Sequence, residues 1–295
     1  MQKLDYAAAL ALLSDGKDAN GTKVPEFEAW LKLHPTMFVL KDKEHSGRFN
    51  VNFAKPVRHF VHRITGGCGN MAPEYWAGMQ RLIDVLRGQS EDQTPQPQMT
   101  GLGLFGGSRM LFKKNPDVVR PGVTEVFPAC AQDCDGAVML GIVARTDKMH
   151  YTPRGLVVST EPKSDFFTIV HPTQCSIAVL QENADVGAPW NAEFLRCADI
   201  VGDLQQEDWK ALLTVYNGGK VTRDEIELWC QMYDQDKTGW NVLLIRGSGG
   251  TADALANDIA WLAEHPNVHV ADCTTEAMRT KLLELGAITP HQQET

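Results

Sequence analysis

The sequence predicts an α/β fold, a Rossmann-like three-layer sandwich with a mostly parallel sheet, preceded by a small N-terminal helical extension. Two observations predict this class. Several short apolar runs, such as Val242–Ile245, have the continuous hydrophobicity of strands buried on both faces. These runs alternate with helical patterns of about ten residues, the alternation typical of right-handed β-α-β units.

The strand patterns begin near residue 60 and continue almost to the C-terminus. Strands are expected at Phe60–Ile64, Leu102–Phe105, Ala137–Val143, Leu156–Ser159, Phe166–Val170, Ser176–Leu180, Leu212–Tyr216, Val242–Ile245 and Val268–Ala271. Helices are expected after Pro73 and at Asn191–Val201, Arg223–Met232, Ala252–Ala263 and Thr275–Leu285. Thr222 and Glu225 match a capping box at the start of the second of these ranges.

Residues 1–50 form a segment with a different pattern. Apolar residues recur with helical spacing in two segments, around Tyr6–Leu13 and Pro25–Leu33. A polar segment that contains glycine separates them. We therefore expect a helical extension over 1–50, a Rossmann-like domain over 51–290, and a polar tail over 291–295.

Composition and charge exclude several classes of function. The chain has 295 residues, of which 43% are hydrophobic and 22% charged, an ordinary globular composition. Its net charge of −9 argues against a nucleic-acid partner, which needs clustered Lys and Arg. No apolar stretch reaches the length of a membrane span, and Asp5 interrupts the N-terminal apolar run, so we expect a cytoplasmic protein without membrane insertion. The seven cysteines have irregular spacing that predicts buried thiols and no metal site.

The most informative segment is Trp240–Asp253, in which an apolar run leads into a glycine-dense turn and then a helical pattern. Glycines permit close backbone approach, hydroxyls can donate hydrogen bonds, and a helix from about Ala252 would point unpaired N–H groups at an anion. The turn therefore predicts a phosphate site, and the alternative is a plain tight turn.

Three more apolar runs end in glycine pairs, at Gly66-Gly67, Gly106-Gly107 and Gly218-Gly219. The carboxyl ends of parallel strands lie along one edge of a sheet, where ligands bind at the point of reversed strand order. Four glycine turns at one edge would form a crevice lined by backbone amides. The alternative is that some of these turns are only short connections.

Several runs together resemble the prokaryotic relatives of the SLOG domain (LSDAT-like) of melastatin-type TRP channels. These runs are RPGVTEV (residues 120–126), LGIVAR (140–145), FTIVHP (167–172), ADVGAPWNAEF (184–194), VYNGGKVTRDEI (215–226) and LLIRGSGGTADALA (243–256). The resemblance covers residues 57–265. It implies a Rossmann-like fold that binds nucleotides or nucleotide-derived signals such as ADP-ribose, often without catalysis.

A wider branch of this superfamily includes phosphoribohydrolases, which share a PGGxGTxxE turn with a glutamate that takes part in the chemistry. Here that position is Ala254, and the nearby acid, Asp253, lies about 100° round the helix. The missing acid favours binding over hydrolysis, although Glu125 or Glu193 could reach the crevice in the fold.

The sequence thus predicts a nucleotide-binding site and assigns no catalytic residue, cofactor or metal. The expected ligand contacts, some of them by resemblance, are Gly66, Gly67, Gly106, Gly107, Ser108, Arg109, Thr124, Glu125, His171, Asn217, Gly218, Gly219, Gly247, Ser248, Gly249, Gly250, Thr251 and Asp253. A nucleotide N-glycosidase and a scaffold with structural glycine turns are the alternative functions. The sequence leaves open the identity of the ligand and whether the chain forms a homo-oligomer.

Overall fold

The computed structural model describes most of the chain beyond residue 57 and short parts of the segment before it. The described ranges are 2–3, 20–23, 37–40, 58–68, 71–89, 96–118, 121–134, 136–144, 150–152, 154–160, 165–172, 175–180, 189–237 and 239–290. The chain divides into two compact units, each built from separate stretches of sequence. The first unit comprises Met1–Asn52, Gly106–Arg120 and Leu140–Cys197, and the second comprises Phe53–Phe105, Pro121–Met139 and Ala198–Thr295.

The second unit is built on a parallel sheet. Its strands lie in the order β5 (Gly101–Gly106), β3 (Phe60–Gly66), β12 (Lys210–Tyr216), β13 (Trp240–Arg246) and β14 (Val268–Asp272), and all neighbouring pairs are parallel. Val242–Ile245 are fully buried, as their continuous hydrophobicity predicts for a strand covered on both faces. The expected α/β class and the mostly parallel sheet are confirmed.

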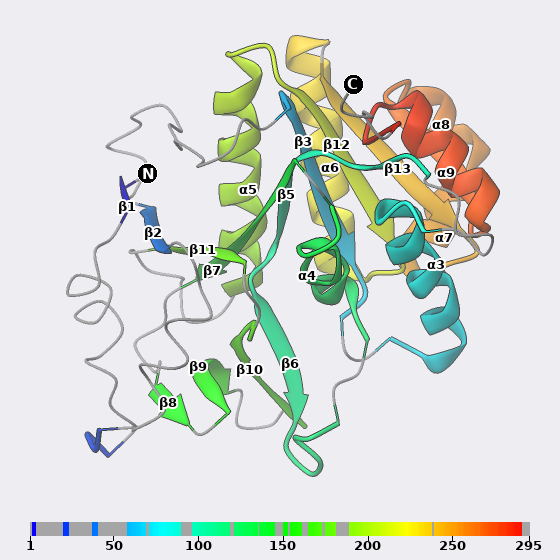
Figure 1. Ribbon diagram of the computed structural model, residues 1–295. Helices are drawn as coiled ribbons and strands as arrows, with labels where there is room; N and C mark the ends of the chain where they lie inside the picture. Colours follow the sequence, from blue (N-terminus) through cyan, green and yellow to red (C-terminus); the bar gives the residue numbers. More distant parts are fainter. Residues whose placement is uncertain are drawn as a thin grey trace. The chain divides into compact units, whose positions relative to one another are not determined.

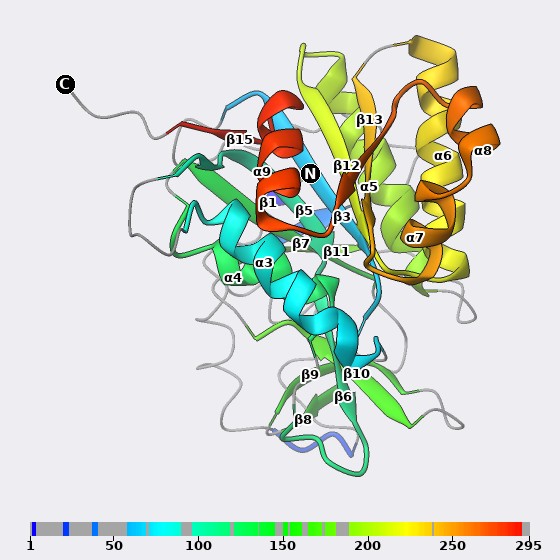
Figure 2. The ribbon, with the colours of Figure 1, turned by 90° about the vertical axis from the view of Figure 1, so that its right-hand side faces the viewer.

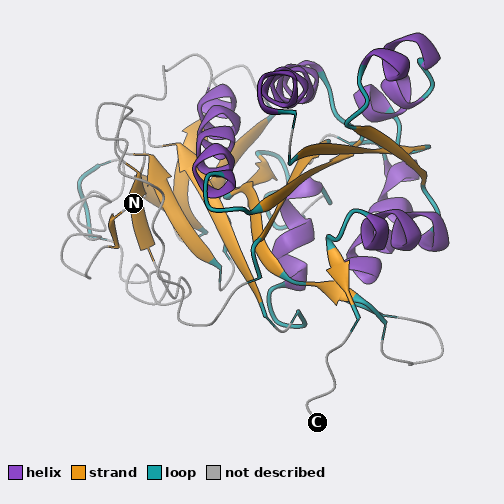
Figure 3. Ribbon diagram, turned by 90° about the horizontal axis from the view of Figure 1, so that it is seen from above, coloured by secondary structure: helices purple, strands orange, loops and turns teal. Residues whose placement is uncertain are grey.

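Helices cover both faces of this sheet (Figure 3). On β3, the His62 ring contacts Phe127 of α4 (Val126–Cys130), whereas the next residue, Arg63, contacts Glu225 of α6 (Lys220–Asp236). Successive side chains of a strand point to opposite faces, so α4 and α6 lie on opposite sides. Helices α3 (Trp76–Leu86) and α9 (Thr275–Glu284) pack side by side, and α3 also packs on α4 (Figure 2). The result is a three-layer, Rossmann-like arrangement.

The direction of chain progression reverses between β3 and β12. From β3 the chain moves outward to β5, and from β12 it moves in the other direction to β13 and then β14 (Figure 1). In an open parallel sheet, ligands bind outside the carboxyl ends of the strands at such a point. The second unit therefore contains a defined position for a site, between the ends of β3 and β12.

Shorter elements complete the second unit. They are the 3₁₀ turns η3 (Pro73–Tyr75) and η4 (Val123–Glu125), the helices α7 (Gly250–Ala256) and α8 (Ile259–Glu264), and the antiparallel strands β4 (Gln98–Met99) and β15 (Ile288–Thr289). Helix α5 (Pro189–Gln205) belongs to the first unit up to Cys197 and to the second from Ala198. No helix of the described residues is long and apolar enough to cross a bilayer.

The first unit contains two groups of strands. One has the order β1 (Gln2–Lys3), β2 (Met37–Leu40), β11 (Ser176–Leu180) and β7 (Ala137–Ala144), with β2, β11 and β7 parallel. The other is antiparallel, in the order β6 (Ser108–Phe112), β10 (Phe166–Val170), β9 (Gly155–Thr160) and β8 (His150–Thr152). Leu111, Val157 and Ile169 form a small core on this second group, against which Phe167 packs.

The structure differs from the predicted elements in several respects. The expected helix 252–263 is two helices, because Asp258 ends the first and caps the second by accepting the Trp261 N–H at 3.0 Å. Helix α6 begins at Lys220, three residues before the expected start. Strands β1, β2, β4, β6, β8 and β15 were not predicted.

The expected N-terminal helices are not tested. Both segments, Tyr6–Leu13 and Pro25–Leu33, lie outside the described residues, and the described elements of residues 1–50 are the strands β1 and β2.

Candidate functional site

Three of the four predicted glycine turns lie at one edge of the second unit's sheet. Tyr216, the last residue of β12, is in register with Gly66, the last residue of β3, and Val215 is in register with Leu244 of β13. The turns Gly66-Gly67, Gly218-Gly219 and Gly247–Gly250 therefore follow neighbouring parallel strands at their carboxyl ends. This part of the predicted convergence is confirmed.

The β3 turn needs its glycines for packing. Gly66 has a φ of +148°, and a Cβ atom there would lie 1.8 Å from the Tyr216 carbonyl oxygen. The Gly67 N–H donates to that same oxygen at 2.9 Å, and the Val123 N–H donates to the Gly67 carbonyl at 2.9 Å. The second contact places η4, with the half-buried Thr124 and Glu125, beside the end of β3. The structure therefore brings four predicted site residues to the same edge of the sheet: Gly66, Gly67, Thr124 and Glu125.

Asn217 joins the β12 turn to the β13 turn. Its backbone is left-handed, with a φ of 62°, a conformation that asparagine tolerates better than most residues. Its N–H donates to Ser248 Oγ at 2.8 Å, its Nδ2 donates to the Ser248 carbonyl at 2.7 Å, and its Oδ1 accepts the Gly218 N–H at 2.8 Å. Ser248 is fully buried and donates onward to the Ile245 carbonyl. The polar groups of Asn217 and Ser248 thus hold two loops together.

The glycine-rich turn after β13 is packed against the β12 turn, and its hydrogen-bonding groups are already used. The Thr251 N–H donates to the Gly218 carbonyl at 2.9 Å, and the Ala252 N–H donates to the Asn217 carbonyl at 3.1 Å. Thr251 Oγ1 donates to the Gly219 carbonyl at 3.0 Å. The expectation that the helix at Ala252 presents these N–H groups to an anion is therefore wrong, because the neighbouring loop supplies their acceptors.

The glycines of this turn also have packing roles. A Cβ on Gly250 would lie 2.3 Å from the Gly218 carbonyl oxygen, and one on Gly249 would lie 2.5 Å from the Tyr75 ring. Both glycines have positive φ, +60° and +76°. Loop packing, with no ligand, is sufficient to explain why the sequence has glycine at these two positions.

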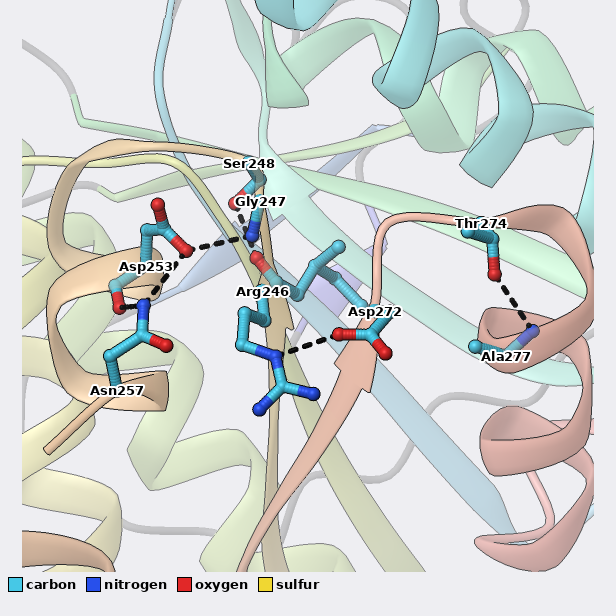
Figure 4. A network of polar contacts seen from close by, with 9 residues as sticks. Arg246, Gly247, Ser248, Asp253, Asn257, Asp272, Thr274 and Ala277 are labelled. Carbon is cyan, nitrogen blue, oxygen red and sulfur yellow. Dashed lines mark hydrogen bonds and ion pairs between the residues drawn. The ribbon is translucent and has the colours of Figure 1, made fainter. Parts of the chain in front are cut away.

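Asp253 completes the same turn (Figure 4). Its Oδ1 accepts the Gly247 N–H at 2.7 Å, and Asn257 Nδ2 donates to it at 3.3 Å. Beside it, Arg246 Nε donates to Asp272 Oδ1 at 2.7 Å, and this contact lowers the pKa of the Asp272 carboxyl. Asp253 therefore closes the turn that precedes α7.

The start of α6 has a different character. Gly219 is its N-cap, and a Cβ on Gly219 would have no atom within 4 Å. Only the Arg223 N–H of the first turn has a partner, the Gly219 carbonyl at 3.0 Å. Within the described chain, the N–H groups of Lys220, Val221 and Thr222 have no acceptor. This helix start is therefore open and presents three backbone donors.

Side chains near the α6 start do not block it. The exposed Lys220 ammonium is bonded to Asp224 at 2.7 Å, one turn further along the helix, and this contact raises the pKa of Lys220. Thr222 lies inside the helix and packs against Gly218, and Glu225 is buried. The predicted capping box is wrong, since the helix begins earlier and Glu225 bonds to Arg63.

Two buried polar groups on β3 lie below this edge, and neither was predicted. Arg63 Nε donates to Glu225 Oε1 at 2.9 Å, with the two side chains 6% and 1% exposed. His62 Nε2 lies 2.7 Å from Thr214 Oγ1, and burial lowers the pKa of His62 to about 3. Polar residues inside the otherwise apolar run of β3 were the sequence signal for both.

Five predicted site residues lie in the first unit: Gly106, which is at the unit boundary, and Gly107, Ser108, Arg109 and His171. Gly106 ends β5, and Gly107 connects it directly to the next strand, β6. Its N–H donates to the Ile142 carbonyl at 2.8 Å, and the buried His171 donates its N–H to the Gly107 carbonyl at 2.8 Å. Ser108 and Arg109 lie in β6, paired with Val170 and Ile169. A ligand role for these five residues stays a prediction.

The described residues contain no group of three or more His, Cys, Asp or Glu side chains that could hold a metal ion. All seven cysteines are thiols that form no disulfide, and five of them are buried.

The chain was also compared with known proteins. No protein-family model matches it, and no curated protein is significantly similar to it. The resemblance to SLOG domains therefore rests on the quoted motifs.

Proposed function

We propose that this protein binds the phosphate of a nucleotide or nucleotide-derived ligand, such as an ADP-ribose derivative, at the start of α6. The observation that carries the proposal is the combination of an open helix start with the reversal of strand order between β3 and β12. Three free N–H groups and the positive end of a 17-residue helix favour an anion at that place.

The rest of the edge supports the same proposal. Gly219 leaves space over the helix start, and the loops around it are fixed by hydrogen bonds between the β3, β12 and β13 turns. A rigid floor reduces the entropy that is lost on binding. Phosphate contacts are thus assigned to Gly219–Thr222, and the α7 turn serves as their support.

We further propose that the protein senses or carries its ligand in the cytoplasm without turnover. Ala254 occupies the position at which the phosphoribohydrolases have their glutamate. The Asp253 carboxylate already accepts hydrogen bonds from Gly247 and Asn257. General acid catalysis of glycosidic cleavage needs a positioned, available acid.

Gly219→Asp tests the site directly. An aspartate at the N-cap should stabilise α6 by about 0.5 kcal/mol, because it bonds the free N–H groups and complements the helix dipole. The same carboxylate should exclude a phosphate, so binding of AMP, ADP and ADP-ribose, measured by calorimetry and thermal shift, should be lost. In the wild type, a ligand at 100 times its dissociation constant should raise stability by about 2.7 kcal/mol.

Ala260→Asp provides the matched control, because it adds the same charge at an exposed position of α8. It should leave binding unchanged. Undiminished nucleotide binding by Gly219→Asp would show that the α6 start does not hold the phosphate.

Hydrolysis of a nucleotide N-glycosidic bond is the second candidate function. It is favoured by one observation, the position of Glu125 on η4 beside Gly67. We expect no release of adenine when the protein is incubated with AMP and the products are separated by chromatography. Multiple-turnover release that is lost in Glu125→Gln would make this protein a hydrolase.

A further inference from the structure

A buried ion pair connects β3 to α6. Arg63 Nε donates to Glu225 Oε1 at 2.9 Å, and Arg63 Nη2 donates to Glu225 Oε2 at 3.4 Å. The two side chains are 6% and 1% exposed. The contact is therefore bidentate and almost completely removed from solvent.

The pair spans the point where strand order reverses. Arg63 lies on β3, in register with Leu213 of β12, whereas Glu225 lies on the helix that follows β12. Residues three and four positions apart share a face of a helix, so Glu225 lies directly below Val221 and Thr222. It fixes the first turn of α6 relative to the strand on the other side of the reversal.

Apolar packing already attaches α6 to the sheet. Ile226 and Trp229 are fully buried, and Trp229 contacts Trp240 of β13 with ring centroids 5.0 Å apart. A buried ion pair adds little to stability compared with a well-packed apolar pair, because desolvation offsets its attraction. Its planar, bidentate geometry does restrict how the helix can rotate or slide, which apolar contacts restrict less.

We propose that Arg63 and Glu225 are positioning residues, which orient the N-terminal amides of α6 toward an anionic ligand and so set the affinity of the site. This inference rests on the proposed function. If the ion pair positions the helix, its loss should lower the affinity for the ligand. If its role is purely structural, its loss should lower the stability of the fold instead.

The test compares stability with affinity in the double variant R63M/E225M. Two methionines fill a similar volume without charge, so the unfolding temperature should stay the same or rise. The affinities for AMP, ADP and ADP-ribose, measured by calorimetry, should fall roughly tenfold, as is typical when a supporting shell is lost. Arg63→Lys keeps the charge without the bidentate contact and should show a smaller loss.

The exposed ion pair Arg223–Glu227, on the same helix at 2.7 Å, supplies the control. Glu227→Gln should leave the affinity unchanged. If R63M/E225M does not fold, Arg63→Lys carries the comparison, with reduced affinity at unchanged unfolding temperature as the expected result.

The outcomes separate the two proposals. Unchanged affinity in folded R63M/E225M and in Arg63→Lys would overturn the positioning role alone. Absence of nucleotide binding by the wild-type chain would overturn the proposed function and this inference with it.

Discussion

At the scale of single residues, the glycines have two different reasons to be present. A side chain at Gly66, Gly249 or Gly250 would overlap a neighbouring loop or ring, whereas one at Gly219 would meet nothing within 4 Å. A valine at position 249 would therefore overlap the Tyr75 ring whether or not this turn contacts a ligand. Sequence alone could not separate these roles, because the atoms that surround each glycine come from distant segments.

His62 should make the protein sensitive to acid. Its pKa is lowered from 6.5 to about 3 by burial, so below pH 6.5 the unfolded chain takes up a proton that the folded chain does not. The free energy of unfolding should therefore fall by about 1.4 kcal/mol for each pH unit between 6.5 and 3, beyond the effects of the carboxylates.

Urea denaturation at several pH values measures this slope. In His62→Gln the protein should be less stable at pH 7, since the contact with Thr214 is altered, but its stability should depend less on pH. An identical slope in the wild type and in His62→Gln would contradict the assignment.

At the scale of elements, the sequence predicted what depends on local pattern. Continuous apolar runs located β3, β12 and β13 to within two residues at most ends, and the stripe after Pro73 located α3. The expected helix 252–263 failed because its apolar pattern continues across Asn257 and Asp258, where a cap interrupts the backbone. Strands β6 and β8 were missed because their sequences are short and weakly apolar.

The candidate site was predicted in part for the same reason. Glycine pairs after apolar runs located three loops at one sheet edge, which needs only local pattern and parallel topology. The sequence assigned the anion to α7, because that turn has the most glycine and hydroxyl residues. The start of α7 is closed by contacts such as the hydrogen bond from the Thr251 N–H to the Gly218 carbonyl. These contacts join residues of different loops, so local sequence pattern does not predict them.

At the scale of the whole molecule, neither unit is a single continuous segment: Met1–Asn52 belong to one unit together with Gly106–Arg120 and Leu140–Cys197. Strand β2, within the expected extension, pairs in parallel with β11 at four positions, from Met37 with Ile177 to Leu40 with Leu180. The first unit therefore combines residues 37–40 with residues from the middle of the chain.

Removal of residues 1–50 should consequently damage the first unit locally. In a chain of residues 51–295, β11 would lose β2 and keep only β7, so the backbone groups on its free edge would be exposed. Hydrogen exchange read by mass spectrometry should show reduced protection over Ser176–Leu180. Val242–Ile245, in the second unit, provide the internal comparison and should keep their protection. Unchanged exchange over Ser176–Leu180 would show that residues 1–50 are an independent appendage, whereas the expected loss would make β2 an integral strand of the first unit.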